Sequence, residues 1–451
     1  MSRLEVNPSL RDSVKAQVRH FASDFAALDR AYPGTYPRMI VRAEGPYLYD
    51  DAGNRTLDAG VSLGVCQIGH GRSAVARAVA EQIEQLDFMG LEAGFSHEPV
   101  ARLAAELGSL MPMQDPGFSF ISSGSEATDL AFKLARAYWR VRGEGARFKI
   151  VSRSNSYHGA GWGGLSATGS DPFRAPFEPI VPGFVRTSQP SPGRCGYCGF
   201  GEACTLACAD DLARVIEREG PGSVAAFIAE PVSIFGAVKI PHPDYWRRIR
   251  EICDAYGVLL IADEVVTGFG RTGRMFASSH WDIEPDLLTM AKGLTSGYVP
   301  MGAVALGPRV QEVLGGTGLM HINTYAGHPV ACAAALAALA ITRNEDLVAN
   351  AAALEPVVRE ALEQIAEGSA RPVRTCALGL LSGIEVAVDA PASDLALEIR
   401  HALYARGISV RAGVGDGVAA VLFYPPLIVD EDMVRTGIAA IGEGLRDVGV
   451  L

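Results

Sequence analysis

Lysine is scarce in this chain. Only five of its 40 basic residues are lysines, so a mechanism that needs a lysine amine has few candidates. The chain also has no run of Lys and Arg, and its formal net charge is −11. These features argue against a nucleic-acid-binding surface. The five lysines are Lys15, Lys133, Lys149, Lys239 and Lys292.

Long apolar segments are missing as well. The first twenty residues carry charges throughout and have no apolar core of the kind found in signal peptides. The Ala-rich stretch from Pro329 to Thr342 is too short to span a bilayer. We therefore expect a cytoplasmic protein with no membrane partner.

Cysteine occurs eight times, and four of these residues are scattered singly, which suits a reducing compartment. The other four form the pattern C-x2-C-x5-C-x3-C: Cys195, Cys198, Cys204 and Cys208. Four such thiols can hold zinc in a closed tetrahedral site, or they can be reduced, packed thiols. We favour the second interpretation, which predicts no metal site. A redox- or metal-responsive regulatory protein that uses these cysteines as its sensor is an alternative of another class.

With 451 residues, 48% of them hydrophobic, the chain has room for one large and one smaller domain. Short apolar strands alternate with amphipathic helices in the middle of the chain, which predicts a mainly parallel sheet covered by helices. We expect residues 71–335 to form this large domain, with a Pro- and Gly-rich irregular excursion at about 170–209. Residues 1–70 and 336–451 are expected to form a smaller α+β domain. The predicted strands are 118–121, 148–151, 224–229, 258–262 and 287–290.

Four clusters of polar residues follow predicted strands, where open parallel sheets bind their ligands. A Ser/Gly turn at Ser123, Gly124 and Ser125 precedes a helix, so its backbone N–H groups and the helix dipole favour a phosphate; Ser125 alone can also be read as a plain helix cap.

The second cluster holds Asp263, which comes directly after four apolar residues, where a carboxylate needs a cation. Val265 is expected on the same face, packed against a flat ring. Taken alone, Asp263 can equally be a helix cap or an ion-pair partner.

The third cluster holds Lys292, between the small residues Ala291 and Gly293. A lysine in a desolvating pocket becomes an imine-forming nucleophile, although a lysine at a strand end is more often a surface residue. The fourth cluster holds Tyr157, an aromatic ring that can stack on the other ring face. Together the four clusters match the phosphate, ring nitrogen, ring faces and aldehyde of pyridoxal 5′-phosphate (PLP).

The chain resembles the class III (omega) aminotransferases of PLP fold type I over nearly its whole length. The motifs that carry this resemblance are SGSEAT, YHG, AEPV, ADEVVTGFGRTG, FASSHWDIEPDLLTMAKGLTSGYVPMGA and NTYAGHPVACAAALA. The resemblance implies that Lys292 forms an imine with the cofactor and that Asp263 pairs with the pyridine nitrogen. It implies cofactor-binding roles for Ser123, Gly124, Ser125, Tyr157, Glu230 and Val265.

The resemblance further implies a homodimer, alone or as a dimer of dimers, in which Thr324 completes the partner's phosphate site. Arg411, in the segment GISVRAG, corresponds to a mobile arginine that binds the substrate carboxylate, and the residues after it read as flexible. Val266 and Gly64 stand where some relatives carry glutamine and tryptophan, respectively. The resemblance therefore does not specify the substrate.

The expected reaction moves an amino group from an amine or ω-amino acid to a keto acid, with pyruvate favoured over 2-oxoglutarate. An aminomutase or a decarboxylating transaminase is the alternative within the same family.

Overall fold

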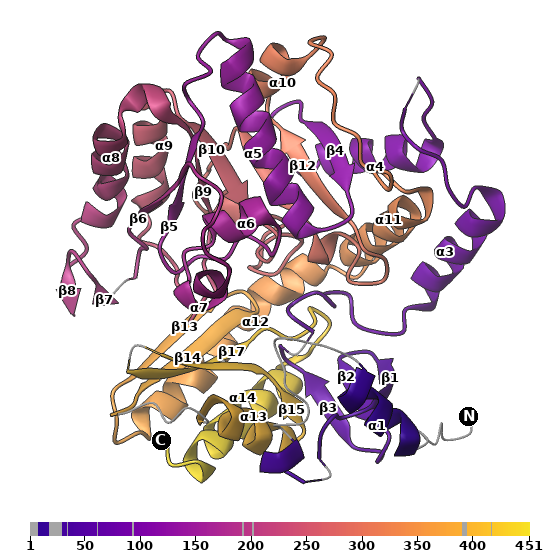
Figure 1. Ribbon diagram of the computed structural model, residues 1–451. Coiled ribbons are helices and arrows are strands. Elements are labelled where there is room, and N and C mark those ends of the chain that lie inside the picture. Colours follow the sequence, from indigo (N-terminus) through magenta and orange to yellow (C-terminus); the bar gives the residue numbers. More distant parts are fainter. Residues whose placement is uncertain are drawn as a thin grey trace.

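The computed structural model describes residues 8–17, 29–33, 35–60, 62–92, 94–191, 194–200, 203–389, 395–415 and 417–451 (Figure 1). The described chain forms a larger upper part, built around a central sheet, and a smaller lower part that holds both the N-terminal and the C-terminal segments (Figure 1). Within these ranges, none of the helices is both long and apolar enough to cross a membrane.

The central sheet has seven strands in the order β4-β12-β11-β10-β9-β5-β6. All neighbours pair in parallel except β12, which is antiparallel to both β11 and β4. The predicted parallel sheet is therefore confirmed. Its strands are β4 (Gly117–Ile121), β5 (Lys149–Arg153), β6 (Phe184–Thr187), β9 (Val224–Ala229), β10 (Leu259–Asp263), β11 (Leu287–Met290) and β12 (Gly302–Leu306).

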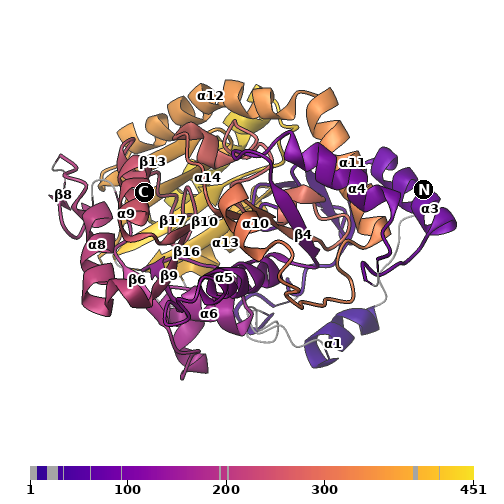
Figure 2. The same cartoon turned by 90° about the horizontal axis from the view of Figure 1, so that it is seen from above.

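Helices cover both faces of this sheet. Its middle strands are therefore buried on both faces. Alternate side chains of β10 pack into opposite layers: Ile261 packs with α5, and Ala262 packs with α4 and α11. Figure 2 shows α5 on one side of β4 and α4 and α11 on the other. The helices of this part are α3 (Ser73–Gln85), α4 (Glu98–Gly108), α5 (Gly124–Val141), α6 (Trp162–Ala167), α7 (Asp171–Arg174), α8 (Ala207–Glu219), α9 (Tyr245–Tyr256), α10 (Pro308–Leu314) and α11 (Pro329–Asn344).

The lower part contains two four-stranded sheets. One is antiparallel, in the order β13-β14-β17-β16, and the other has the order β1-β2-β3-β15. Their strands are β1 (Ile40–Glu44), β2 (Tyr47–Asp50), β3 (Arg55–Asp58), β13 (Val373–Leu378), β14 (Leu381–Ala387), β15 (Ile408–Ser409), β16 (Arg411–Gly415) and β17 (Val418–Phe423). The helices are α1 (Pro8–Gln17), α12 (Leu347–Glu367), α13 (Leu395–Ala405) and α14 (Glu431–Asp447).

The N-terminal strands belong to the same core as the C-terminal elements. Ile408 of β15 pairs with Leu57 of β3, and Leu57 packs in one apolar cluster with Ile438 of α14. This packing agrees with the expectation that both ends build the smaller part. The domain boundaries at residues 70 and 335 stay a prediction.

Two expectations about local structure were wrong. The stretch 170–209 is less irregular than expected, because β6 lies within it and forms the edge strand of the central sheet beside β5. It also contains the short hairpin β7 (Arg194–Cys195) and β8 (Gly199–Phe200). The residues after Arg411 are not flexible either, because 411–415 form β16, paired along its length with β17. Position 416 lies outside the described residues.

A cluster of Asp58, Cys66 and His70 ties the N-terminal segment together. Nε2 of His70 lies 3.0 Å from Oδ2 of Asp58, and the ligating atoms of all three residues lie within 4.8 Å of one another. Burial alone would lower the pKa of His70, but the Asp58 carboxylate and the Cys66 thiol outweigh burial and raise that pKa to about 9. Hydrogen bonds from His70 and Ser62 hold the pKa of Asp58 below its usual value although burial opposes them. The three groups thus satisfy one another.

The interaction of His70 with Asp58 predicts that the stability of the folded protein depends on pH. Because the folded pKa of His70 exceeds the unfolded value of about 6.5, its contribution is fully present below about pH 6.5 and is lost as the pH rises through about 9. We expect wild-type protein to exceed His70→Gln in unfolding free energy by on the order of 2 kcal/mol at pH 6, and this gap to close by about pH 10. Denaturant unfolding across this pH range measures the gap. His242→Gln, at a half-exposed histidine, is the control, and a gap that does not change with pH would contradict the assignment.

Candidate active site

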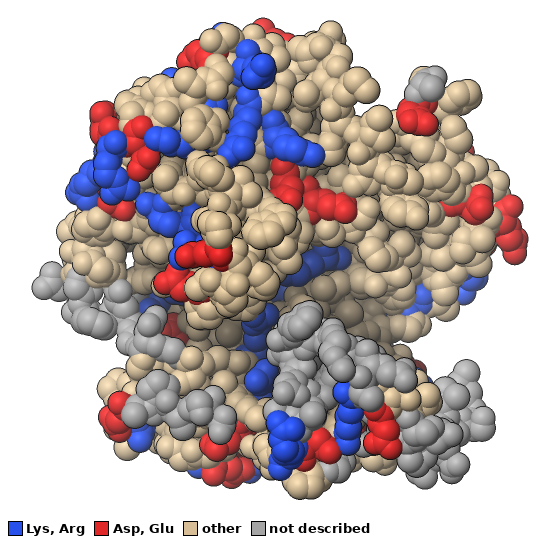
Figure 3. Space-filling model, viewed as in Figure 1, with Lys and Arg blue, Asp and Glu red and all other residues tan. Residues whose placement is uncertain are grey.

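The polar clusters predicted from the sequence meet at one edge of the central sheet. Strands β4, β5, β9, β10 and β11 all run toward this edge, and β12 starts from it, where Gly302 pairs with Ile121. Asp263 ends β10 there, and Glu230 and Lys292 follow β9 and β11 within two residues. In Figure 3 the molecule is hollowed between its two parts, and Lys and Arg side chains are visible in the hollow.

The turn between β4 and α5 forms a cradle of backbone N–H groups. Ser123 is the N-cap of α5, and its Oγ accepts a hydrogen bond from the N–H of Glu126 at 3.2 Å. Gly124 and Ser125 therefore lie in the first helical turn, where N–H groups have no partner within the helix and favour an anion. Reading Ser125 as a plain cap is wrong. Its Oγ instead accepts from the N–H of Ala160 at 3.0 Å.

Glycines allow three segments to meet closely at this cradle. A Cβ on Gly124 would lie 3.0 Å from a methyl group of Val265, and a Cβ on Gly159 would lie 2.9 Å from the Cα of Ser125. Gly159 also has a φ of +124°, which L side chains rarely adopt. The cradle, Val265 and the loop after β5 are thus packed together without room for larger side chains.

Asp263 is buried, and each of its two carboxylate oxygens has a hydrogen-bond partner. Its Oδ2 lies 2.7 Å from Nδ1 of His158, and its Oδ1 accepts from Oγ1 of Thr289 at 3.2 Å and from the N–H of Val265 at 3.2 Å. The expected carboxylate at the end of β10 is therefore present. His158 is a residue that sequence reasoning missed, although the YHG motif contains it.

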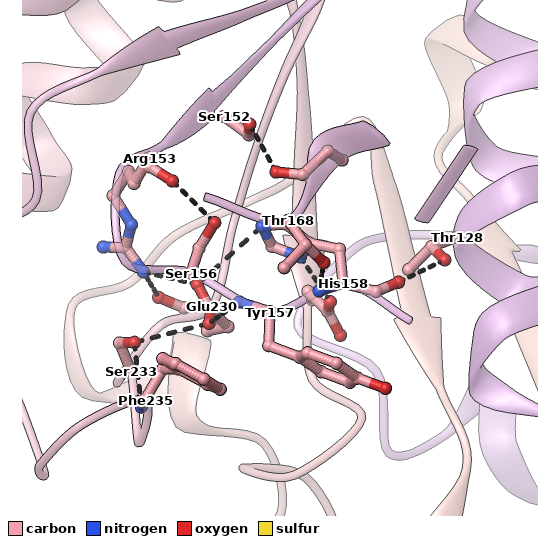
Figure 4. A network of polar contacts seen from close by, with 12 residues as sticks. Thr128, Ser152, Arg153, Ser156, Tyr157, His158, Thr168, Glu230, Ser233 and Phe235 are labelled. Carbon is pink, nitrogen blue, oxygen red and sulfur yellow. Dashed lines mark hydrogen bonds and ion pairs between the residues drawn. The ribbon is translucent and has the colours of Figure 1, made fainter. Parts of the chain in front are cut away.

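Glu230 links the loop after β5 to β9. Oε2 of Glu230 lies 3.0 Å from a guanidinium nitrogen of Arg153, and Oε1 accepts from the N–H of Tyr157 at 3.2 Å (Figure 4). Burial alone would raise the pKa of Glu230, but His158 and Arg153 outweigh burial and lower it. The predicted cofactor-binding Glu230 thus contacts the backbone of Tyr157 and positions that loop.

The ring of Tyr157 belongs to an aromatic group at the mouth of the site. It stacks on Phe235 with 6.2 Å between ring centroids, and the edge of Phe173 approaches at 5.6 Å. Burial and the charge of Asp263 raise the pKa of its hydroxyl, whereas Arg411 acts in the opposite direction. Tyr157 therefore lies within electrostatic reach of both charged residues.

Lys292 begins a short 3₁₀ helix (Lys292–Leu294) directly after β11 and has a φ of +39°, which is uncommon for a residue with a side chain. Burial lowers the pKa of its amine to about 8; Arg411 adds to this effect, and Asp263 opposes it. Among the five lysines, Lys239 is also desolvated, and burial lowers its pKa, but its Nζ donates to the carbonyl of Phe235 at 2.5 Å. Lys239 is therefore a second desolvated lysine, with a backbone carbonyl as its partner.

Arg411 comes from the lower part of the molecule. Its backbone is paired in β16, opposite Leu422, and its charge opposes the burial that raises the pKa of the Tyr424 hydroxyl. Tyr424 in turn donates to the carbonyl of Gly60 at 3.1 Å and lies against Gly64, where a Cβ would be 2.9 Å from the ring. These residues form a side of the site that is separate from Asp263 and Lys292.

Thr324 lies apart from the other predicted residues on the surface. It is exposed, in the loop between α10 and α11. The neighbouring Asn323 donates from Nδ2 to Oε2 of Glu126 at 3.2 Å, so this loop passes the first turn of α5.

Comparison with known proteins places this fold and site among the aminotransferases. The family model for aminotransferase class-III matches residues 29–445. A putrescine–pyruvate aminotransferase of Pseudomonas aeruginosa is 36% identical over 405 residues, which cover 88% of each chain. An (S)-enantioselective omega-transaminase from Thermomicrobium roseum has a similar structure, with a TM-score of 0.89, 36% identity and 98% of each chain covered.

A third similar structure is an amine transaminase from an uncultivated Pseudomonas species in the PLP-bound form. Its TM-score is 0.88 at 34% identity, and the match covers 96% of this chain and 99% of the other. Fold and site thus define a transaminase of PLP fold type I. The chain belongs to the class III aminotransferases.

Proposed function

We propose that this aminotransferase binds PLP at the carboxyl edge of its central sheet and transfers an amino group from an amine or ω-amino acid to pyruvate. The observation that carries the proposal is Lys292, an amine whose pKa burial lowers to about 8 beside the buried Asp263. A buried amine near a carboxylate, next to a cradle of helical N–H groups, fits an aldehyde, a ring nitrogen and a phosphate on one molecule. When bound, PLP supplies an electron-withdrawing ring and an aldehyde that accepts the amino group.

Each residue has a distinct part in holding the cofactor. Ser123, Gly124 and Ser125 would bind the phosphate, because the first turn of α5 presents its N–H groups there. Val265 and Tyr157 would lie on the two ring faces. Asp263 would hold a proton on the ring nitrogen, and His158 and Thr289 keep its carboxylate in place. Glu230 would act through the Tyr157 backbone.

Lys292 would hold the cofactor and move the reacting proton. A pKa of about 8 leaves a useful fraction of the amine neutral near neutral pH, and a base works best when its pKa is near the working pH. Lys292 would take the proton from the substrate carbon next to nitrogen and deliver it to the neighbouring carbon of the cofactor.

We predict that Lys292→Ala lowers kcat by about a thousandfold or more, because no other group replaces the amine. Borohydride treatment of the purified holoenzyme, followed by peptide mapping, should fix the cofactor on Lys292. Lys239→Met is the matched control, because Lys239 is the second desolvated lysine. The control should keep the label on Lys292, and a label on Lys239 in the wild type would refute the assignment.

The carboxylate of the keto acid is proposed to bind Arg411. This arginine lies within electrostatic reach of Lys292, Tyr157 and Tyr424. A guanidinium matches a carboxylate with two parallel hydrogen bonds. Because the backbone of Arg411 is held in β16, an amine without a carboxylate would be accommodated by movement of the side chain alone. The name of the Pseudomonas aeruginosa relative supports pyruvate as the acceptor and an amine as the donor.

We predict that Arg411→Ala raises KM for pyruvate by at least about thirtyfold, since losing one partner of a buried charge pair costs about 2–5 kcal/mol. KM for an amine without a carboxylate should change little. Steady-state kinetics with each substrate varied in turn give both values, and Arg435→Ala, at a surface ion pair, is the control. Equal effects on the two substrates would remove Arg411 from the acceptor site.

A homodimer, alone or as a dimer of dimers, is proposed from the exposed apolar surface beside the site. Met320 and Ile322 are 83% and 71% exposed, and such clusters on soluble proteins usually mark an interface. The loop 315–328 meets the segment after α3, where the rings of Phe88 and Tyr325 lie 6.0 Å apart. Thr324 lies in this loop and is proposed to bind the phosphate in the partner's site. The exposed apolar residues of the two segments are Phe88, Leu91, Phe95, Leu319, Met320, Ile322 and Tyr325.

Subunit mixing tests this arrangement. Inactive Lys292→Ala and Thr324→Val protomers would be mixed under conditions that allow exchange. Random pairing makes half of the dimers hybrids, and each hybrid has one site with both residues intact, so about a quarter of the sites should recover activity. Mass spectrometry of the assemblies verifies exchange. If hybrids form and both parents are inactive, a failure to recover activity places Thr324 in its own subunit's site.

All eight cysteines are free thiols. We propose a cytoplasmic location on this basis, because a reducing compartment keeps thiols free.

A further inference from the structure

Four cysteines outside the active site meet where the hairpin β7–β8 joins α8. Cys195 ends β7, and Cys198 follows the turn and directly precedes β8. Cys204 lies three residues before α8, and Cys208 lies in the first turn of that helix. The chain thus brings two pairs of thiols, one from a tight turn and one from a helix start, to the same place.

The four cysteines pack together in one apolar cluster. Cys195, Cys198 and Cys208 are 6%, 6% and 3% exposed, and Cys204, which is half-buried, packs against the same cluster. Among these four described residues, no three sulfurs lie within 4.8 Å of one another. The thiols are therefore close together but are not arranged as a tetrahedron.

Hydrogen-bond donors around the sulfurs suit thiolates. The N–H of Thr205 lies 3.4 Å from Sγ of Cys198, and the hydroxyl oxygen of Thr205 lies 3.3 Å from the same sulfur. Metal-bound thiolates are commonly supported by such outer contacts, which offset their negative charge.

The hairpin β7–β8 is short. The two strands have two residues each and are joined by two paired positions. A two-stranded hairpin of this length is not stable alone in water. Among the described residues, Tyr197 ties the hairpin to α8 in two ways: its hydroxyl donates to Asp211 at 2.6 Å, and the guanidinium of Arg214 lies 5.3 Å from the centre of its ring. Asp211 also accepts from Ser188 next to β6. A metal bridging the two thiol pairs would fasten the hairpin to the helix.

We propose that Cys195, Cys198, Cys204 and Cys208 bind one zinc ion as a closed structural site. Four thiolates from two short-spaced pairs fill the tetrahedral coordination of zinc and leave no open position for a substrate. Soft sulfur ligands select zinc over magnesium and calcium. Zinc binding would therefore bring the four sulfurs closer together than they lie in the structure. This inference is independent of the reaction proposed above.

Metal analysis of the holoenzyme, purified without chelators, tests the proposal. We expect about one zinc per chain by mass spectrometry of the elements, and X-ray absorption at the zinc edge should show four sulfur neighbours at about 2.3 Å. The double variant Cys195→Ser/Cys198→Ser should lose the zinc. The matched control Cys332→Ser/Cys376→Ser removes two thiols that pack in other apolar clusters and should keep the zinc.

Three results would overturn the proposal. These are less than about a tenth of a zinc per chain with four reactive thiols, disulfides among the four cysteines, or zinc bound through nitrogen or oxygen ligands. If the double variant does not fold, the single variant Cys204→Ser provides the comparison, because Cys204 is the least buried of the four. Loss of one sulfur neighbour or of the zinc supports the site, and an unchanged sulfur count contradicts it.

Discussion

A carboxylate can be buried only where other groups satisfy it, and Asp263 draws these groups from three parts of the chain. His158 comes from the loop after β5, Thr289 from β11, and the N–H of Val265 from the turn after β10. Glu230 adds a second buried carboxylate that holds the N–H of Tyr157. The loop after β5 therefore cannot leave the sheet without breaking bonds to two buried charges, and the position of the Tyr157 ring follows from this constraint.

The charges around Lys292 act against one another. Burial and Arg411 favour the neutral amine of Lys292, whereas Asp263 favours the ammonium. Burial is the largest of these effects, so the pKa falls to about 8. Asp263 and Arg411 thus shift the pKa of Lys292 in opposite directions. The arginine from the lower part of the molecule therefore also affects the protonation of a lysine on the central sheet.

The sequence predicted the sheet well because buried parallel strands are nearly continuous apolar runs, as Val224–Ala229 and Leu287–Met290 illustrate. It failed where position depends on distant partners. β6 has the sequence FVRT and lies at the sheet edge, so it shows no apolar run. β16 contains two glycines, which are depleted in strands, and only its pairing with β17 makes it one.

The same limit applies to side chains of the site. Three serines, Ser122, Ser123 and Ser125, lie around the start of α5, and the backbone path alone decides that Ser123 is the cap. The motif around Asp263 similarly mixes roles that its letters do not separate. Glu264 is buried and accepts hydrogen bonds from Ser278 and Thr267, whereas the buried Arg271 donates to the carbonyls of Leu380 and Pro425 in the lower part. Part of the motif therefore builds the fold around the site and joins the two parts of the molecule.

The groups assigned to the chemistry and those assigned to substrate recognition come from different parts of the chain. Asp263 and Lys292 lie on the central sheet, whereas Arg411 and Tyr424 lie on the small antiparallel sheet and its exit, against the N-terminal segment at Gly60 and Gly64. Gly64 has a φ of +70° and no room for a Cβ beside the Tyr424 ring, so a larger residue there would press on Tyr424. The hydrogen bonds of Asp263 involve none of these residues. A change at Gly64 would therefore reshape the side of the site proposed to bind the substrate and leave the partners of Asp263 in place.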